Sequence, residues 1–116
     1  MSQKIVLVVE DNSEVLDMYR RFFQDLQIEV WEATSIEDAL TFLRRTHELS
    51  GIVWDGVLRK TCSFDGAIQQ FKRVFNGPMI AASRSTKSLD LQMAAGCTHI
   101  AAPIDRFEVL KQVFNQ

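Results

Sequence analysis

The sequence has few of the residues that define special classes of protein. It contains only two cysteines and two prolines, and its five glycines form no repeat. Neither a CxxC pair nor a histidine at a metal-ligand spacing accompanies the cysteines, which argues against a disulfide scaffold and a structural zinc site. We therefore expect Cys62 and Cys97 to be reduced thiols without a catalytic role.

Neither sign of charge dominates, and long apolar runs are missing. Thirteen Lys and Arg residues oppose fifteen Asp and Glu residues, for a formal net charge of -2. No overall field therefore attracts nucleic acid or an anionic membrane. The apolar run near the start, residues 5–9, is too short for a signal peptide or a membrane span. We expect a cytoplasmic protein with no nucleic-acid partner and no membrane partner.

What is present suffices for one globular domain. The chain has 116 residues, of which 47% are hydrophobic and 24% are charged. That length supports one core and is short for two. We predict a single domain over residues 1–116, with no output domain in this chain.

Apolar runs typical of strands alternate with apolar residues at helical spacing. The runs that predict strands cover residues 4–9, 28–33, 51–55, 78–83 and 98–102. The helical patterns cover residues 14–26, 36–47, 64–75, 89–95 and 107–114. Five strands that alternate with five helices predict an α/β fold. Its five-stranded parallel sheet is doubly wound, with helices over both faces.

Polar side chains stand where most of the predicted strands end. Glu10 and Asp11 follow the first strand, Asp55 ends the third and Ser83 ends the fourth, whereas Ala102 ends the fifth. Ligands of open parallel sheets bind beyond these carboxyl ends. Three carboxylates at one edge repel one another unless a cation compensates their charge. Oxygen ligands favour Mg²⁺, which keeps coordination positions free for phosphate oxygens. The alternative for each acid alone is a helix cap or a solvated loop residue.

Four segments in this order resemble the receiver domains of two-component response regulators, over essentially the whole chain. VVEDN resembles the acidic pair of that family, with Glu10 and Asp11, and WDGVL resembles its phospho-acceptor segment, with Asp55. PMIAAS places Ser83 at the switch hydroxyl, and MAAGCTHIAAP resembles the stretch that leads into a Lys-Pro pair. The resemblance implies the (βα)5 flavodoxin-like receiver fold.

The resemblance also implies a mechanism for phosphoryl transfer. Asp55 would accept a phosphoryl group from a histidine kinase or a phosphotransfer protein. Glu10, Asp11, Asp55 and the main-chain carbonyl of Val57 would hold Mg²⁺, and Ser83 would turn toward the phosphoryl oxygens.

The same resemblance implies how the signal would leave the domain. Output is expected through protein contacts of the surface formed by the fourth helix, the fifth strand and the fifth helix, toward an unknown downstream protein. Such a receiver is not an enzyme beyond its own phosphorylation and dephosphorylation. We expect a monomer or a weak dimer.

The end of the fifth strand departs from the family pattern. Ala102 stands where the family has a lysine that pairs with the phosphoryl group. The spacing from Gly96 to Pro103 is one residue short, which leaves Ile100 nearest to the position of the aromatic switch residue. The family often has a cis peptide before this proline, so a cis Ala102–Pro103 bond is expected.

Two arginines also depart from the family pattern. Arg84 follows Ser83, where a small residue is usual, and Arg59 stands where proline is usual. Because a guanidinium offers a fixed fork of donors for phosphate, Arg84 is our candidate for the substitute cation. The alternatives are that Arg84 blocks the pocket, or that both arginines are solvated loop residues.

Other functions remain open at this stage. The missing lysine, the missing aromatic residue and Arg84 also fit a degenerate receiver that works as a phosphorylation-independent interaction module. An FMN or nucleotide binder would need a glycine-rich or hydroxyl-rich loop where this chain has Glu10, Asp11 and Asn12. A Mg²⁺ phosphohydrolase would need a lid that the chain is too short to build.

We expect the two histidines, His47 and His99, to have structural roles, because no nucleophile is arranged beside either of them as in a catalytic triad.

Overall fold

The structure, a computed structural model, describes residues 4–45, 48–55 and 64–114, in which strands and helices alternate throughout. The strands are β1 (Ile5–Val9), β2 (Glu29–Ala33), β3 (Leu49–Trp54), β4 (Met79–Ala81) and β5 (His99–Ile100). The helices are α1 (Ser13–Asp25), α2 (Ile36–Arg45), α3 (Phe64–Lys72), α4 (Thr86–Ala95) and α5 (Arg106–Phe114). All the elements predicted from the sequence are present. Our predictions for His47, Val57, Arg59 and Cys62 fall outside the described residues.

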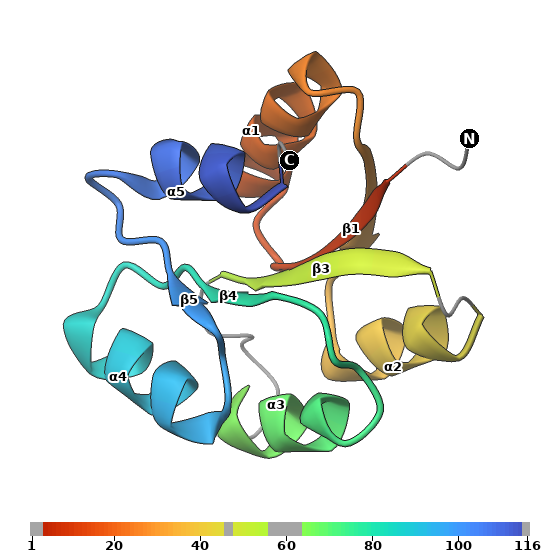
Figure 1. Ribbon diagram of the computed structural model, residues 1–116, viewed down its shortest axis with the longest axis vertical. Helices are drawn as coiled ribbons and strands as arrows, with labels where there is room; N and C mark the ends of the chain where they lie inside the picture. The colour runs from red at the N-terminus through yellow and green to blue at the C-terminus, as the bar shows by residue number, and fades with distance from the viewer. Residues whose placement is uncertain (1–3, 46–47, 56–63, 115–116) are drawn as a thin grey trace.

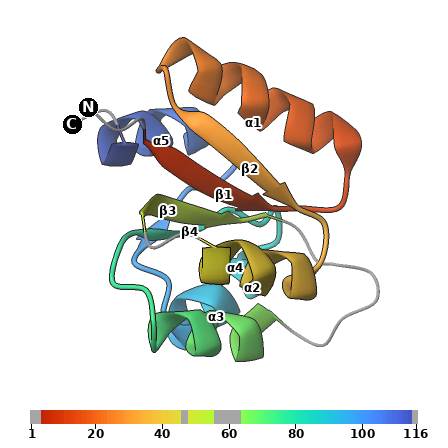
Figure 2. The ribbon, with the colours of Figure 1, turned by 90° about the vertical axis from the view of Figure 1, so that its right-hand side faces the viewer.

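The strands form one parallel sheet in the order β2-β1-β3-β4-β5. Helices α1 and α5 lie on one side of this sheet, and α2, α3 and α4 lie on the other (Figures 1 and 2). The predicted doubly wound α/β fold is therefore confirmed. Of the helices described, none is long and apolar enough to cross a membrane.

Two separate cores result from this arrangement, one on each face of the sheet. Beneath α1 and α5, Tyr19, Phe23 and Phe114 pack with alternate residues of β1 and β3. On the other face, Trp54 and Phe71 meet edge to face, with ring centroids 5.2 Å apart. Residues 6–9 of β1 and 51–54 of β3 are buried on both faces, which explains why these stretches carry no polar side chain.

Local signals at the helix ends fix where the chain turns. Asn12 caps α1, and its side chain accepts hydrogen bonds from the N–H groups of Glu14 and Val15. Ser85 caps α4 in the same way, through the N–H of Ser88. Gly96 ends α4 at a φ of 132°, a left-handed conformation that other residues rarely adopt.

The expectation of a cis bond before Pro103 is wrong, because the described residues contain no cis peptide. Asp105 instead donates its N–H to the carbonyl of Ala102 at 3.1 Å, which closes a four-residue turn with Pro103 in its second position. Proline with a trans bond suits that position.

The fourth and fifth strands are also shorter than predicted, since residues 82–83 and 101–102 already belong to the loops.

Candidate functional site

The sheet itself positions the residues at its carboxyl edge. The N–H groups of Glu10, Asp55, Ala82 and Ala101 each donate to a carbonyl of a neighbouring strand or strand end, at 3.0, 3.1, 3.0 and 2.8 Å. Each of these residues directly follows the last residue of its strand. Their backbone positions are therefore set by ladder-type hydrogen bonds.

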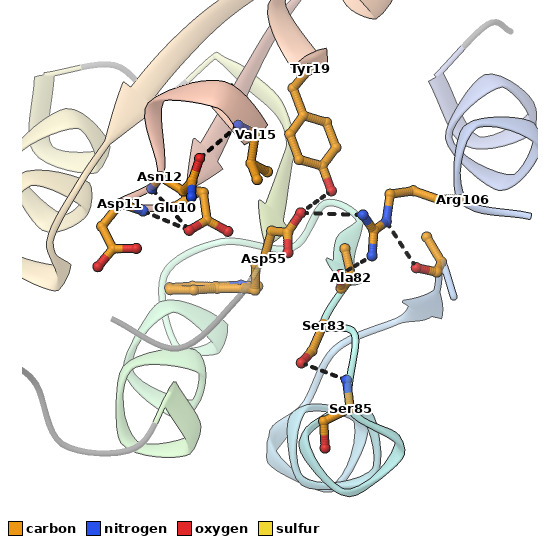
Figure 3. A network of polar contacts seen from close by, with 12 residues as sticks. Glu10, Asp11, Asn12, Val15, Tyr19, Asp55, Ala82, Ser83, Ser85 and Arg106 are labelled. Atoms are coloured by element: carbon orange, nitrogen blue, oxygen red, sulfur yellow. Dashed lines mark hydrogen bonds and ion pairs between the residues drawn. The ribbon is translucent and has the colours of Figure 1, made fainter. Parts of the chain in front are cut away.

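Asp55 lies buried at the centre of this edge, with an exposed fraction of 3%. The hydroxyl of Tyr19 donates to its Oδ2 at 2.5 Å. Nη1 of Arg106 lies 3.6 Å from the same oxygen, and both side chains of this ion pair are buried. Figure 3 shows Tyr19 and Arg106 converging on one oxygen of the carboxylate from α1 and α5. A buried carboxylate is thus compensated by one cation and one hydroxyl donor.

Glu10 is the second buried acid of the site, with an exposed fraction of 4%. Its Oε1 accepts hydrogen bonds from the N–H groups of Asp11 and Asn12, at 2.9 and 3.1 Å. Burial raises the pKa of Glu10 to about 7, and the negative charge of Asp55 adds to that rise. A cation between these two buried carboxylates would be stabilised by their negative charge.

Asp11, the third predicted acid, is exposed, and its carboxylate points away from Asp55 (Figure 3). Within residues 4–45, 48–55 and 64–114, no three acidic, histidine or cysteine side chains stand together as a metal-binding group. Val57, whose carbonyl we predicted as a ligand, is outside these ranges. The described geometry therefore brings two of the predicted ligands together, Glu10 and Asp55, and the four-ligand set stays a prediction.

Ser83 and Arg84 line the same cavity as the acids. This cavity has a volume of about 360 Å³, and its walls include Glu10, Asp11 and Asp55. Ser83 is buried, and its Oγ accepts a hydrogen bond from the N–H of Ser85 at 3.3 Å. Arg84 is exposed, and its role as a substitute cation stays a prediction.

The two side chains that contact Asp55 most closely are not among the residues predicted from the sequence. Apolar spacing places Tyr19 correctly on the buried face of α1, but it gives no role to the hydroxyl. Tyr19 is the single tyrosine of the chain, on a face that otherwise needs only apolar residues. Arg106 is the first residue of α5, where a positive charge is opposed by the helix dipole. Both features could have indicated a polar partner.

Comparisons with known proteins give a consistent fold. No family model matches the sequence, and no curated protein matches it significantly. A two-component response regulator from Clostridium difficile has a similar structure, with a TM-score of 0.82 at 13% identity over 98% of each chain. A CheY-like receiver domain from Methylobacillus flagellatus has a TM-score of 0.79 at 18% identity, over 97% of this chain and 99% of that one.

A third similar structure is the receiver domain of a Saccharomyces cerevisiae response regulator, solved with a histidine phosphotransfer signaling protein. Its TM-score is 0.79 at 18% identity, over 96% of this chain and 86% of that one. All three likenesses extend over nearly the whole of this chain. The chain has the flavodoxin-like fold of response-regulator receiver domains.

Proposed function

We propose that this chain is a signal receiver whose Asp55 accepts a phosphoryl group from a phosphohistidine, in a reaction that depends on Mg²⁺. The observation that carries the proposal is the position of Asp55. It is a buried carboxylate at the carboxyl end of the central strand β3, beside a second buried acid, in a receiver fold. Neighbouring buried acids in a cleft are a frequent mark of a functional site.

The donor set fits Mg²⁺, which commonly uses one or two carboxylates and keeps several waters. Glu10 and Asp55 would hold the ion from two adjacent strand ends, and Asp11 could join after a change of side-chain rotamer. When bound, the metal would neutralise charge on the phosphoryl oxygens and align them with the attacking carboxylate. The rise in the pKa of Glu10 that Asp55 helps to cause supports a site built for a cation.

The chain's own residues would orient the acceptor for transfer. Tyr19 and Arg106 both bind Oδ2 of Asp55, which leaves Oδ1 to attack. In the step, a bond forms between that oxygen and phosphorus while the P–N bond of the phosphohistidine breaks and the imidazole takes the electron pair. Ser83 lines the same cavity, where its hydroxyl would donate to a phosphoryl oxygen. The chain would be an acceptor, with no turnover beyond its own phosphorylation and dephosphorylation.

Partners and output follow from the same proposal. A histidine kinase or a phosphotransfer protein would be the donor, and one structurally similar receiver was solved with such a phosphotransfer protein. Leu91 of α4, Ile100 of β5 and Ile104 of the following loop are exposed by 51, 43 and 96%. We propose that these three side chains contact a downstream protein. We also propose that the receiver itself acts in the cytoplasm, as a monomer or a weak dimer.

One observation favours a second function. Oδ2 of Asp55 is already bound by Tyr19 and Arg106, and the carboxylate of Asp11 points away. These contacts satisfy Asp55 without a phosphoryl group or a metal. They would suit a degenerate receiver that binds its partner through the surface of Leu91 and Ile104 without phosphorylation.

The direct test is phosphoryl uptake. The protein would be incubated with Mg²⁺ and phosphoramidate or acetyl phosphate, and intact mass would report a phosphoryl adduct. We expect an adduct that forms only with Mg²⁺ and that the Asp55→Asn variant lacks. An unchanged mass under conditions that label a known receiver would refute the acceptor function and leave the interaction module.

A further inference from the structure

Arg106 is buried to an exposed fraction of 6% and contacts three parts of the fold. Its Nη1 faces Oδ2 of Asp55 at 3.6 Å. Its Nη2 donates to the carbonyl of Ala82 at 2.6 Å, and its Nε donates to the carbonyl of Ala101 at 3.5 Å. Arginine is rarely buried unless its charge and donors are paired. Here the fork of the guanidinium joins the ends of β3, β4 and β5.

The guanidinium lies beside the strand end at which the family lysine is missing. Ala101, whose carbonyl it binds, directly precedes Ala102, and Ala82 directly precedes Ser83. The methyl group of Ala102 carries no charge and packs against the apolar core on the opposite face. The positive charge beside the acceptor therefore comes from the first turn of α5, four residues beyond the position that the family pattern predicts.

We infer that Arg106 is the phosphate-binding cation of this receiver, and that it links the state of Asp55 to helix α5. The inference rests on the proposed function, since it assumes that Asp55 accepts a phosphoryl group. Phosphorylation would move negative charge from Oδ2 outward to the phosphoryl oxygens. The guanidinium, whose planar fork suits phosphate, would follow that charge.

The movement has a defined structural consequence. Because Nε and Nη2 hold the carbonyls of Ala101 and Ala82, a shift of the guanidinium strains or breaks these two bonds. The backbone of Arg106 is the start of α5, so the same shift pulls on that helix. The signal would thus reach α5 directly, without a lysine at residue 102 and without the aromatic switch residue that this chain lacks.

Arg84 is the competing candidate for the cation. It is exposed at the wall of the cavity, whereas Arg106 is buried and already paired with Asp55. A buried, fixed donor loses less freedom on binding phosphate than an exposed side chain does. The two candidates predict opposite results for Arg84→Ala and Arg106→Ala, which makes the inference testable.

The experiment measures the rate of Asp55 phosphorylation by acetyl phosphate with Mg²⁺, from intact mass, in the wild type and in single variants. In the reaction, Oδ1 of Asp55 bonds to phosphorus while acetate leaves with the electron pair of the broken P–O bond. Arg106→Ala should slow uptake on the order of 100-fold, the usual cost of one lost charge-stabilising donor. Arg84→Ala should change the rate of uptake by less than about threefold, because it removes no donor that is fixed at the acceptor. Arg73, an exposed arginine remote from the site, provides the matched control Arg73→Ala.

A conservative variant separates a charge effect from a structural one. Arg106→Lys, which keeps the charge but not the fork, covers the case in which Arg106→Ala does not fold, and it should give an intermediate rate. Circular dichroism would confirm folding of each variant.

A second readout needs no phosphoryl transfer. In the absence of metal, the NMR signal of the Arg106 Nε–H should differ between the wild type and Asp55→Asn. In the wild type, the same signal should shift when beryllofluoride and Mg²⁺ are added. Wild-type rates in Arg106→Ala and Arg106→Lys, or a loss confined to Arg84→Ala, would overturn the inference alone. A wild-type protein that takes up no phosphoryl group would overturn the proposed function first, and this inference with it.

Discussion

The hydroxyl of Tyr19 donates a 2.5 Å hydrogen bond to Oδ2 of Asp55, which ties helix α1 to the end of strand β3. Both side chains are buried, with exposed fractions of 0 and 3%. Burial and the negative charge of Asp55 raise the pKa of Tyr19 well above its ordinary value. Tyr19 therefore keeps its proton at any physiological pH and remains a donor to the acceptor carboxylate.

Removing this hydroxyl should destabilise the metal-free protein. A hydrogen bond to a charged group contributes about 1.5–3 kcal/mol, and Tyr19→Phe removes the donor while keeping the ring. The ring also packs against Phe23 and Phe107, with centroids 6.4 and 6.1 Å away, so these contacts are preserved. We expect the free energy of unfolding to fall by about 2 kcal/mol, measured with urea in EDTA at neutral pH.

A double-mutant cycle isolates the contact from other effects of the change. Tyr19→Phe in an Asp55→Asn background should cost clearly less than in the wild type, because the charged acceptor is then absent. Equal costs in the two backgrounds would mean that the hydroxyl does not interact with Asp55 in solution.

The raised pKa of Glu10 gives the metal-free protein a specific pH dependence. The pKa of Glu10 rises from 4.5 to about 7 on folding, so the folded state holds this proton more tightly than the unfolded chain does. The resulting stabilisation is complete below pH 4.5 and is lost as the pH rises through about 7. At about 1.36 kcal/mol per pKa unit, the loss is on the order of 3 kcal/mol.

This contribution can be separated from those of the other acids by comparison with Glu10→Gln. The variant cannot release a proton at this position, so its unfolding free energy should fall less between pH 4.5 and about 7 than that of the wild type. Urea denaturation at several pH values in EDTA would measure both slopes. Parallel slopes would show that Glu10 ionises normally in the folded protein.

Gly51 is required by the packing of α5 against β3. A Cβ atom at this position would lie 2.3 Å from Cε1 of Phe114 and 3.2 Å from the carbonyl oxygen of Pro78. Gly51→Ala should therefore destabilise the fold by about 1–3 kcal/mol, as overpacking does. Gly66 of helix α3 is the matched control, because a Cβ atom added there would meet nothing within 4 Å. Gly66→Ala should stabilise by about 0.5–1 kcal/mol, and thermal unfolding would compare the two.

The positions of Glu10, Asp55 and Ser83 could be predicted because strand ends are visible in the sequence. Each apolar run is one strand, and the parallel sheet brings the carboxyl ends of all its strands to one edge. Apolar periodicity and capping residues such as Asn12 determine these boundaries with little help from distant parts of the chain. The fold and the central residues of the site therefore follow from local patterns.

The partners of Asp55 could not be predicted in this way. Tyr19 and Arg106 reach the carboxylate with the ends of long side chains, from helices that precede and follow it by many residues. Their direction depends on how α1 and α5 pack on the sheet and on the turn at residues 102–105. The direction of Asp11 likewise depends on one side-chain rotamer. These features are set by tertiary packing, which the spacing of residues does not specify.

Binding of Mg²⁺ by Glu10 and Asp55 can be tested independently of phosphorylation. Glu10 and Asp55 are buried close enough that the charge of Asp55 raises the pKa of Glu10, so a divalent cation should bind there and relieve the repulsion. Trp54, which directly precedes Asp55, is fully buried, and a Trp31→Phe background would make it the only tryptophan. We expect a saturable change in its fluorescence on addition of Mg²⁺, reversed by EDTA.

The variants Glu10→Gln and Asp55→Asn should each weaken Mg²⁺ binding at least about tenfold. Glu14 is an exposed acid of α1, so Glu14→Gln should leave the affinity unchanged. Equal affinity in all the variants would place the ion elsewhere on the protein.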